Sequence, residues 1–599
     1  MQKNNVQKQL DRFLHKVLKP ARYIGNEPNM VYKEQGEFDI RFAFCFPDTY
    51  EIGMSSMGLS LLYHIVNNTK TTYMERVFAP DTDFEELMRE NNLPLYTLES
   101  KTPVRDCDIV GFTIQYEMLY TNILNMLELS GIPLLSKDRD DSYPLVVAGG
   151  PCAFNPEPLA DFFDLVMIGD GENQIVALCE EYNKMKNSGM SKKDMLAELS
   201  KIDGVYVPSL KNNVTRAFLS SLEDVDYPDN NIVPFIEVVH DRSVVELFRG
   251  CSRGCRFCQA GMIYRPVRER SMERNLELAK AQLKNSGHNE ISLLSLSSSD
   301  YTGIKALVDA LSDYCKPRNI GISLPSLRLD NFSFDLLQKI QGVKRTGLTF
   351  ACEAGTQRLR DVINKNVTEK DLFSALSTAM DLGWNGVKLY FMIGLPTETD
   401  EDLDGIVDLA KRIQDLAYDK NAGKHGRFNV NISVSNFVPK PFTPFQWVEQ
   451  DSPEEFERKH LYLKNKLSKI KGVQMHYHGS FTSSLEAVFA RGGRELSELL
   501  IKAHEYGCKF DSWTEHFDEA AWKKALAECN IDSSYYGLKG FDVTDELPWD
   551  HINSGVSKQY LLDEYNRALN AKTTKDCRYG CNGCGINQYT ECSMGGIYD

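Results

Sequence analysis

Short apolar runs alternate with amphipathic segments between residues 37 and 210. The runs are DIRFAFCFPD, DIVGFTI, PLVVAGGP and FDLVMIGDGE, and segments such as SSMGLSLLYHIVNN and YEMLYTNILNMLELSG lie between them. Runs of this length, separated by helical segments, are typical of parallel strands that helices cover on both faces. The pattern therefore predicts a doubly wound parallel sheet, which binds ligands at the carboxyl ends of its strands.

A second series of apolar runs extends from residue 243 to about residue 440. The runs are SVVELF, ISLLSLSS, GISLPSL, RTGLTFACE, GVKLYFMIG and FNVNISVSNFVP, with helical segments such as ERNLELAKAQLKNS between them. Six such units predict a partial (β/α)6 barrel of the TIM-barrel type, with its chemistry at the C-terminal ends of the strands.

The remaining segments are mostly charged and helical, apart from a cysteine-rich end. They lead us to divide the chain as follows: a helical lead-in (1–36), the α/β domain (37–210), a linker (211–242), the barrel (243–450), a helical accessory region (451–575) and a four-cysteine tail (576–599).

Charge and hydropathy narrow the class of protein. No apolar run approaches the roughly 20 residues that cross a bilayer, and the polar N-terminus lacks a signal-peptide core. We therefore predict a cytoplasmic protein without a membrane segment. The net charge of −16 argues against a broad nucleic-acid surface and leaves a local basic groove open.

The fifteen cysteines indicate metal or redox chemistry. Eight are scattered and are expected to be small buried residues. The other seven form two compact clusters, at 251–258 and 577–592.

The first cluster is Cys251, Cys255 and Cys258, spaced C-x3-C-x2-C directly after SVVELF. Three thiolates on one loop hold three irons of a [4Fe–4S] cube and leave the fourth iron open to a small molecule. The alternative is a zinc knuckle, which normally needs a fourth Cys or His nearby. No His lies between Arg249 and Arg270, so the pattern favours the iron–sulfur cluster.

This motif, with Phe257 before its last cysteine, resembles the signature of the radical S-adenosylmethionine (SAM) superfamily. The resemblance implies that SAM binds the open iron and is cleaved to a 5′-deoxyadenosyl radical. It also implies an external one-electron reductant of the flavodoxin or ferredoxin type.

The ends of the later predicted strands carry residues that the resemblance assigns to SAM. An arginine at position 328 suits the SAM carboxylate in fork geometry, and Glu353 stands where the superfamily often has a ribose-binding residue. GLPTE is similar to the segment that packs against adenine, and SNFVPKPFTPF to a string of methylthiotransferase-like and B12-type members. The implied SAM contacts are Phe257, Ser298, Ser299, Arg328, Glu353, Gly394, Pro396 and Val438.

The arrangement GGP…NPEP…D…IGDGE resembles the B12-binding-type domain that precedes the barrel in one branch of the superfamily. The cobalt-ligating form of that domain carries an Asp-x-His-x-x-Gly loop, which this sequence lacks. The one histidine between residues 37 and 210 is His64, in a helical segment. Cobalamin is therefore a candidate cofactor that binds without a protein ligand, or the domain has lost it.

The second cluster is Cys577, Cys581, Cys584 and Cys592, spaced C-x3-C-x2-C-x7-C among glycines. Four thiolates complete a coordination shell. Two interpretations compete: a zinc site that staples a short tail, and an auxiliary [4Fe–4S] cluster. The repeat of the C-x3-C-x2-C spacing favours iron–sulfur.

Nearly the whole chain resembles one poorly characterised radical SAM branch, whose members are often fused to or encoded beside a small separate domain. The resemblance implies modification of an unidentified substrate by methyl transfer or related C–H functionalisation. Methylthio or sulfur insertion into RNA or protein is the alternative, with Cys45, Cys107 and Cys152 as loose candidates for a further cluster. A non-catalytic iron–sulfur carrier is the hypothesis of another class. His476 and His478 lie on one face of a predicted strand, either as edge residues or as a proton donor near substrate.

Overall fold

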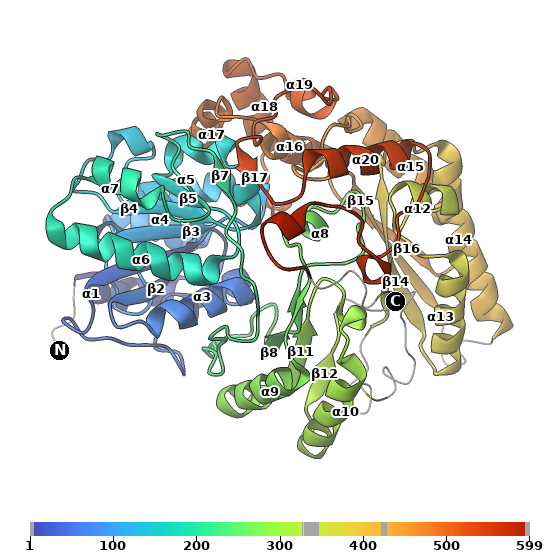
Figure 1. Ribbon diagram of the computed structural model, residues 1–599, viewed down its shortest axis with the longest axis horizontal. Coiled ribbons are helices and arrows are strands. Elements are labelled where there is room, and N and C mark those ends of the chain that lie inside the picture. Colours follow the sequence, from blue (N-terminus) through green and yellow to red (C-terminus); the bar gives the residue numbers. More distant parts are fainter. Residues whose placement is uncertain (1–4, 326–327, 329–338, 340–346, 421–427, 593–599) are drawn as a thin grey trace.

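The computed structural model describes residues 5–325, 328, 339, 347–420 and 428–592. They form an N-terminal α/β domain, a barrel segment of parallel strands with outer helices, and a C-terminal helical region beside both (Figure 1). The predicted fold class is confirmed.

The N-terminal sheet has the strand order β2-β1-β3-β4-β5-β6. The first five strands in this order run parallel, and β6 is antiparallel to β5. Between β1 and β3 the winding direction reverses, which is where doubly wound sheets bind ligands. The strands are β1 (Ile40–Phe46), β2 (Thr72–Phe78), β3 (Ile109–Thr113), β4 (Leu145–Gly149), β5 (Leu165–Met167) and β6 (Val205–Tyr206).

Helices cover both faces of this sheet (Figure 1). Each begins at a polar residue where the sequence offers one: the Ser56 side chain, for example, accepts the N–H of Leu59 at the start of α3. The helices are α1 (Asn5–Phe13), α2 (Tyr50–Gly53), α3 (Met57–Asn67), α4 (Thr82–Asn91), α5 (Tyr120–Leu129), α6 (Gly171–Ser188) and α7 (Lys192–Leu199).

Strand β2 is one that the apolar pattern did not predict. All seven of its residues are buried, yet two of them are charged. The guanidinium of Arg76 pairs with Glu27 at 2.9 Å and with Glu99 at 2.6 Å, and Glu75 pairs with Arg41. Buried charges are tolerated where they are paired in this way, so the strand stays buried despite its polar letters.

The barrel is built from two parallel sheets among the described residues, β12-β11-β8 and β13-β14-β15-β16. The six expected strands are present, and β16 adds a seventh beyond residue 450. The strands are β8 (Ser243–Glu246), β11 (Glu290–Leu294), β12 (Gly321–Ser323), β13 (Thr349–Glu353), β14 (Gly386–Ile393), β15 (Asn429–Asn436) and β16 (Val473–Tyr477). The helices are α8 (Ala260–Ile263), α9 (Met272–Ser286), α10 (Ile304–Cys315), α12 (Gln357–Val362), α13 (Glu369–Asp381) and α14 (Asp400–Asp419).

The C-terminal helices pack against both the N-terminal domain and the barrel. Buried side chains of α16 to α20 share one apolar core with the N-terminal domain, whereas those of α15 pack in the core of the β13–β16 sheet. In addition, β17 (Ile552–Asn553) pairs with β7 (Val214–Thr215). The same contact is polar at Asp511, which accepts the hydroxyl of Thr121 at 2.6 Å. The helices are α15 (Pro453–Leu467), α16 (Ser480–Arg491), α17 (Leu496–Glu505), α18 (Glu519–Glu528), α19 (Ser533–Gly537) and α20 (Lys558–Leu569).

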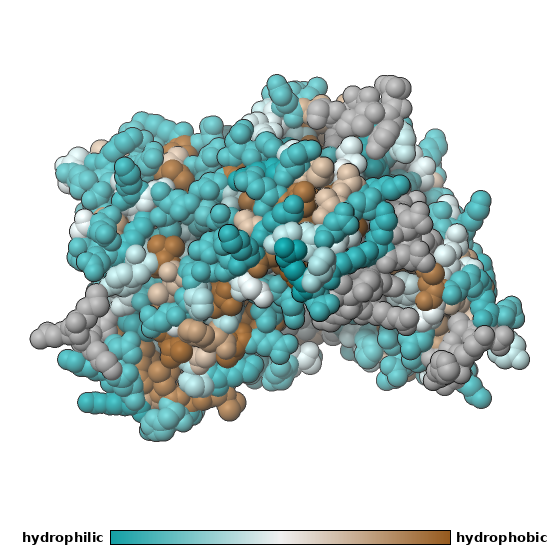
Figure 2. All heavy atoms as spheres, turned by 90° about the horizontal axis from the view of Figure 1, so that it is seen from below, coloured by the Kyte–Doolittle hydropathy of each residue, from teal (hydrophilic) through white to brown (hydrophobic). Residues whose placement is uncertain are grey.

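The face shown in Figure 2 is mostly hydrophilic, with apolar side chains gathered on the side of the N-terminal domain. Among the described helices, none is long and apolar enough to span a membrane.

Candidate functional site

The predicted cluster loop follows β8 and ends at α8, so it lies at the carboxyl end of the first barrel strand. Its flanks pair as a short antiparallel ladder, β9 (Phe248–Arg249) with β10 (Arg268–Glu269). Gly250 enters the loop at φ +91°, and a Cβ there would stand 2.4 Å from the carbonyl oxygen of Pro266. Only glycine fits this close approach.

Cys251, Cys255 and Cys258 are all half-buried on this loop. Burial raises the pKa of Cys251 to about 11 and that of Cys258 to about 12, and the neighbouring thiol of Cys255 contributes to both shifts. The positive charges of Arg328 and Lys365 act in the opposite direction on Cys251 and Cys258 respectively. Thiols must lose their protons to bind metal. Burial disfavours the resulting thiolates, and a bound metal cation would stabilise them.

Among the described residues, no three Cys, His, Asp or Glu side chains stand together as a site for one metal ion. Four sulfurs around a single zinc stand only about 4 Å apart. In a [4Fe–4S] cube each thiolate binds a different iron, so its sulfurs stand farther apart. In neither cysteine cluster, therefore, do the described sulfurs stand close enough together to bind one metal ion.

Two of the predicted SAM contacts meet beside the cluster loop. Glu353 accepts a hydrogen bond from the Lys365 ammonium at 3.0 Å, and Nη2 of Arg328 donates to the carbonyl of Lys365 at 2.8 Å. Glu353 has a φ of +65° and lies at a register shift in β13, an uncommon conformation for a residue other than glycine. The local backbone thus turns this carboxylate toward the loop.

Lys365 was missed by sequence reasoning. It is 9% exposed and lies in the INKN segment after α12, which matches no motif. Its neighbour Asn364 donates to the carbonyl of Gly254 at 3.1 Å. The segment therefore supports the cluster loop from the β13 side of the barrel, a placement that only the fold reveals.

Ser298 and Ser299, which follow β11, form hydrogen bonds with different partners. The Ser298 hydroxyl is fully buried and donates to the carbonyl of Leu293 at 3.0 Å, so it holds its own turn. Ser299 is half-buried and accepts the N–H of Arg328 at 3.4 Å. Ser326 lies outside the described residues.

The remaining predicted contacts surround one apolar cluster. Phe257 packs against Ala354, Leu395 and Phe437, which follow β13, β14 and β15. Pro396 and Val438, adjacent to two of these residues, are half-buried. At Gly394 (φ +79°) a Cβ would stand 2.6 Å from the ring of Phe456, so the turn after β14 requires glycine. Three of the strand ends that the sequence offered as SAM contacts therefore lie at one apolar cluster.

The C-terminal tail lies against the cluster loop. The backbone N–H of Cys577 donates to the carbonyl of Ser252 at 3.1 Å, and the Ser252 hydroxyl donates to Asp576, also at 3.1 Å. Figure 1 shows the red C-terminal segment over α8, the helix that follows the loop. The two cysteine clusters are therefore neighbours in space.

A buried set of four charges fixes this contact. Arg253 of the cluster loop pairs with Asp576 at 3.0 Å and with Asp300, and Arg578 pairs with both carboxylates at 3.0 Å. Burial alone would raise the pKa of Asp300, but the two arginines lower it to about 2. The end of β11, the cluster loop and the tail are thus joined by ion pairs that stay charged.

The four tail cysteines differ in exposure. Cys584 is buried and Cys577 half-buried, whereas Cys581 and Cys592 are exposed. The two less exposed cysteines, Cys577 and Cys584, are therefore the ones that the fold shields from solvent.

A cavity of about 390 Å³ connects the two domains. Its walls come from the carboxyl ends of β1, β3, β4 and β5, and from Gly250 and Tyr264 at the cluster loop. Apolar and glycine residues predominate, and none of the described residues lining it is a histidine. The cavity therefore joins the ligand-binding edge of the sheet to the predicted cluster.

Ion pairs connect the N-terminal domain to the cluster loop beside this cavity. Asp170 of the IGDGE turn pairs with Arg249 at 2.9 Å and with Arg268, and Arg249 also pairs with Glu172 at 2.6 Å. Burial alone would raise the pKa of Asp170, but the surrounding arginines hold it well below its usual range.

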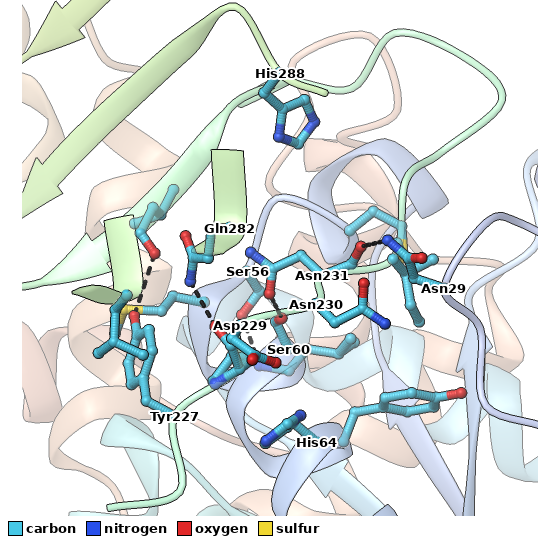
Figure 3. Close-up of a pocket in the computed structure, with 18 of the residues that line it drawn as sticks. Asn29, Ser56, Ser60, His64, Tyr227, Asp229, Asn230, Asn231, Gln282 and His288 are labelled. Atoms are coloured by element: carbon cyan, nitrogen blue, oxygen red, sulfur yellow. Dashed lines mark hydrogen bonds between the residues drawn. The ribbon is translucent and has the colours of Figure 1, made fainter. Parts of the chain in front are cut away.

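A second, more polar cavity of about 510 Å³ lies between α3, the segment around residues 226–242 and α9. Figure 3 shows His64 on α3 below it and His288 on the opposite side. His64 contacts Asp226 at 3.0 Å, and Ser60 bonds Asn231 at 3.1 Å. His64 thus serves a side-chain network and does not face the sheet edge.

The other candidates fall outside the cluster region. Cys45 and Cys107 are buried in the N-terminal core, and no group of three metal-ligating side chains among the described residues includes them or Cys152. His476 lies on β16 and His478 just after it. Burial lowers the pKa of nearby His460 to about 4, and the charge of His478 acts in the same direction.

Two family descriptions match this chain. "Radical SAM proteins, N-terminal" covers residues 58–208, and "Radical SAM superfamily" covers residues 245–410. An uncharacterized protein of Methanocaldococcus jannaschii is 30% identical over 498 residues, which are 81% of this chain and 98% of that protein. The chain belongs to the radical SAM superfamily.

Two further relatives of this radical SAM protein have names that describe a reaction. An "uncharacterized methyltransferase" of Pyrococcus horikoshii is 24% identical over 52% of this chain and 66% of its own length. A tRNA-2-methylthio-N(6)-dimethylallyladenosine synthase of Petrotoga mobilis is 21% identical over 50% of this chain and 72% of its own length.

Proposed function

We propose that this radical SAM protein holds a [4Fe–4S] cluster on Cys251, Cys255 and Cys258 and uses it to cleave SAM reductively. The product radical then modifies an unidentified substrate by methyl transfer or a related C–H functionalisation. The observation that carries the proposal is that Arg328 and Glu353 both bond Lys365, whose neighbour Asn364 bonds the three-cysteine loop at Gly254.

Bound cluster and SAM would supply a 5′-deoxyadenosyl radical. The residues of the chain position SAM and shield it. Arg328 offers a planar fork of N–H donors to a carboxylate, and Glu353 offers a carboxylate to ribose hydroxyls. The apolar cluster at Phe257 excludes water from the adenine side. An external one-electron donor of the flavodoxin or ferredoxin type supplies the electron.

Methyl transfer is supported by the Pyrococcus relative and by the cavity between sheet and cluster loop. The sheet order and the apolar walls suit a flat cofactor at the switch point. Gly149 and Gly169 at the strand ends and Gly250 and Tyr264 at the cluster loop are among the residues that would hold cobalamin there, and no described lining residue is a histidine. Bound cobalamin would supply a methyl carrier.

Methylthio or sulfur insertion into RNA or protein is the second candidate. It is supported by the Petrotoga relative and by the tail cysteines Cys577, Cys581, Cys584 and Cys592, which would hold a second [4Fe–4S] centre. The tail lies next to the first cluster loop, through the bond from Cys577 to Ser252. A non-catalytic iron–sulfur carrier would need neither Arg328 nor Glu353 at the loop.

The cluster is tested by electron paramagnetic resonance of the anaerobically reconstituted, reduced protein with and without SAM. SAM should change the signal of the wild-type protein, and this change should be absent when Cys251, Cys255 and Cys258 are all replaced by Ala. A Cys529→Ala variant is the matched control, because Cys529 lies far from both clusters in the sequence and is not a proposed ligand. An unchanged SAM response in the triple variant would rule out the assignment.

A further inference from the structure

Arg265 is a buried arginine that pairs with no acidic side chain among the residues that the structure describes. Arg265 is 3% exposed. Neither Nη1 nor Nη2 of its guanidinium donates a hydrogen bond to any described residue. Its Nε donates to the carbonyl of Gly261 at 3.0 Å. This bond satisfies one N–H donor but does not neutralise the positive charge. A buried, always-charged guanidinium in this state is costly unless an anion completes the site.

The groups around this guanidinium belong to both cysteine clusters. A Cβ on Gly254, in the cluster loop, would stand 3.4 Å from Nη2. On the other side, Tyr560 of α20 places its ring 5.2 Å from the guanidinium carbon. Burial lowers the pKa of Arg265, but Tyr560, Cys577 and Cys584 more than offset this and raise the pKa above its usual value.

Thiols as such do not neutralise the arginine, because they are uncharged at neutral pH. Four thiolates around a metal do, since their charge outweighs that of Zn²⁺ or of a [4Fe–4S] core. Sulfur atoms of such a centre accept hydrogen bonds, and these bonds tune iron–sulfur sites. Cys577 and Cys584 are the less exposed pair of tail cysteines. The N–H of Ser557, at the start of α20, donates to the carbonyl of Cys584 at 2.9 Å, and the N–H of Cys577 donates to the carbonyl of Ser252 at 3.1 Å. Both cysteines therefore lie beside the two elements that enclose Arg265.

We propose that Arg265 donates hydrogen bonds from its two unpartnered nitrogens, Nη1 and Nη2, to the sulfurs of an anionic metal–thiolate centre at Cys577 and Cys584. This inference rests on the second centre of the proposed function and adds the barrel residue that holds it. Arg265 is a positioning residue that belongs to the barrel, whereas the ligands belong to the tail. The centre would therefore assemble only when the tail is docked on the cluster loop.

The test uses the full chain with Cys251, Cys255 and Cys258 replaced by Ala, so that the tail alone binds metal. After anaerobic reconstitution with iron and sulfide, the iron and zinc retained against increasing EDTA are measured. Arg265→Gln should lower metal affinity about 10- to 100-fold, the usual effect of losing a partner of metal ligands. Arg265→Lys keeps the charge and should restore most of it.

Arg491→Gln is the matched control, because Arg491 is also buried (1% exposed) and bonds only backbone carbonyls among its described hydrogen bonds. Equal retention in Arg265→Gln and Arg491→Gln would overturn the inference. The inference would also be overturned if circular dichroism showed that metal-free Arg265→Gln is unfolded and if Arg265→Lys bound metal no better than Arg265→Gln. A parent protein that binds no metal would also overturn it, and SAM cleavage by the wild-type protein would then show that the radical SAM function stands independently.

Discussion

The backbone N–H of Cys577 donates a hydrogen bond to the carbonyl of Ser252 at 3.1 Å, so the tail cysteines lie directly on the predicted cluster loop. Neighbouring Cα atoms are about 3.8 Å apart along the chain. Cys251 and Cys577 are therefore on the order of 10 Å apart at the backbone. Two metal centres at these positions would be close enough for direct electron exchange.

The SAM contacts give the first prediction. Glu353→Ala and Arg328→Ala should each weaken SAM binding by about 1.5–3 kcal/mol, the scale of a hydrogen bond to a charged group. Iron content should stay near the wild-type value, because neither side chain is a proposed iron ligand. SAM affinity is measured by isothermal titration of the reconstituted protein.

Arg358→Ala is the control for this pair, since Arg358 follows the same strand but bonds Thr397 and Asp402 instead of the loop. Equal SAM affinity in all three variants would show that the strand-end assignment is wrong.

The tail gives the second prediction. If Cys577, Cys581, Cys584 and Cys592 hold a cluster, reconstituted protein should carry about eight irons, twice the four of one cube. A variant with these four cysteines replaced by Ala should keep about four irons and still cleave SAM slowly, because the radical step needs only the barrel. Iron and sulfide assays with product chromatography test both statements.

One zinc and four irons in the anaerobic wild-type protein would instead identify a structural staple. The cysteine variant should then lose thermal stability, and sulfur insertion would lose its main support.

Asp511 gives a prediction on pH. Burial raises its pKa to about 6, although Thr121 and Trp522 donate hydrogen bonds to it. A carboxyl with a raised folded-state pKa stabilises the fold below its unfolded pKa, and this contribution is lost as pH rises from about 4 to about 6. Relative to Asp511→Asn, the wild-type protein should lose roughly 3 kcal/mol of unfolding free energy across that window, at about 1.36 kcal/mol per pKa unit. Urea unfolding of both proteins at pH 4 and pH 7 measures the difference, and an identical difference at both pH values would refute it.

The apolar pattern predicted β1, β3 and β4 because these strands are almost wholly buried and need few polar residues. It predicted β13, β14 and β15 from the alternation of buried and partly exposed positions. It missed β2, where Arg76 and Glu75 interrupt the run and are neutralised by partners from other segments. It also did not identify β16 as a barrel strand. Val473–Tyr477 is a partly exposed strand, so its burial pattern is weak.

Cys251, Cys255 and Cys258 could be proposed from the sequence because an iron–sulfur loop fixes the spacing of its ligands locally. Lys365 and Arg265 could not, because their roles come from what surrounds them in space. The contact between Ser252 and Cys577 joins positions 325 apart in the sequence, and no local pattern carries that information.

The central claim is tested most directly by measuring 5′-deoxyadenosine and methionine after anaerobic incubation of reconstituted wild-type protein with SAM and dithionite. We predict that both products form in equal amounts, and that neither forms above background when Cys251, Cys255 and Cys258 are replaced by Ala. Wild-type protein that carries a reducible [4Fe–4S] cluster yet forms no 5′-deoxyadenosine would contradict the proposal and favour an iron–sulfur carrier.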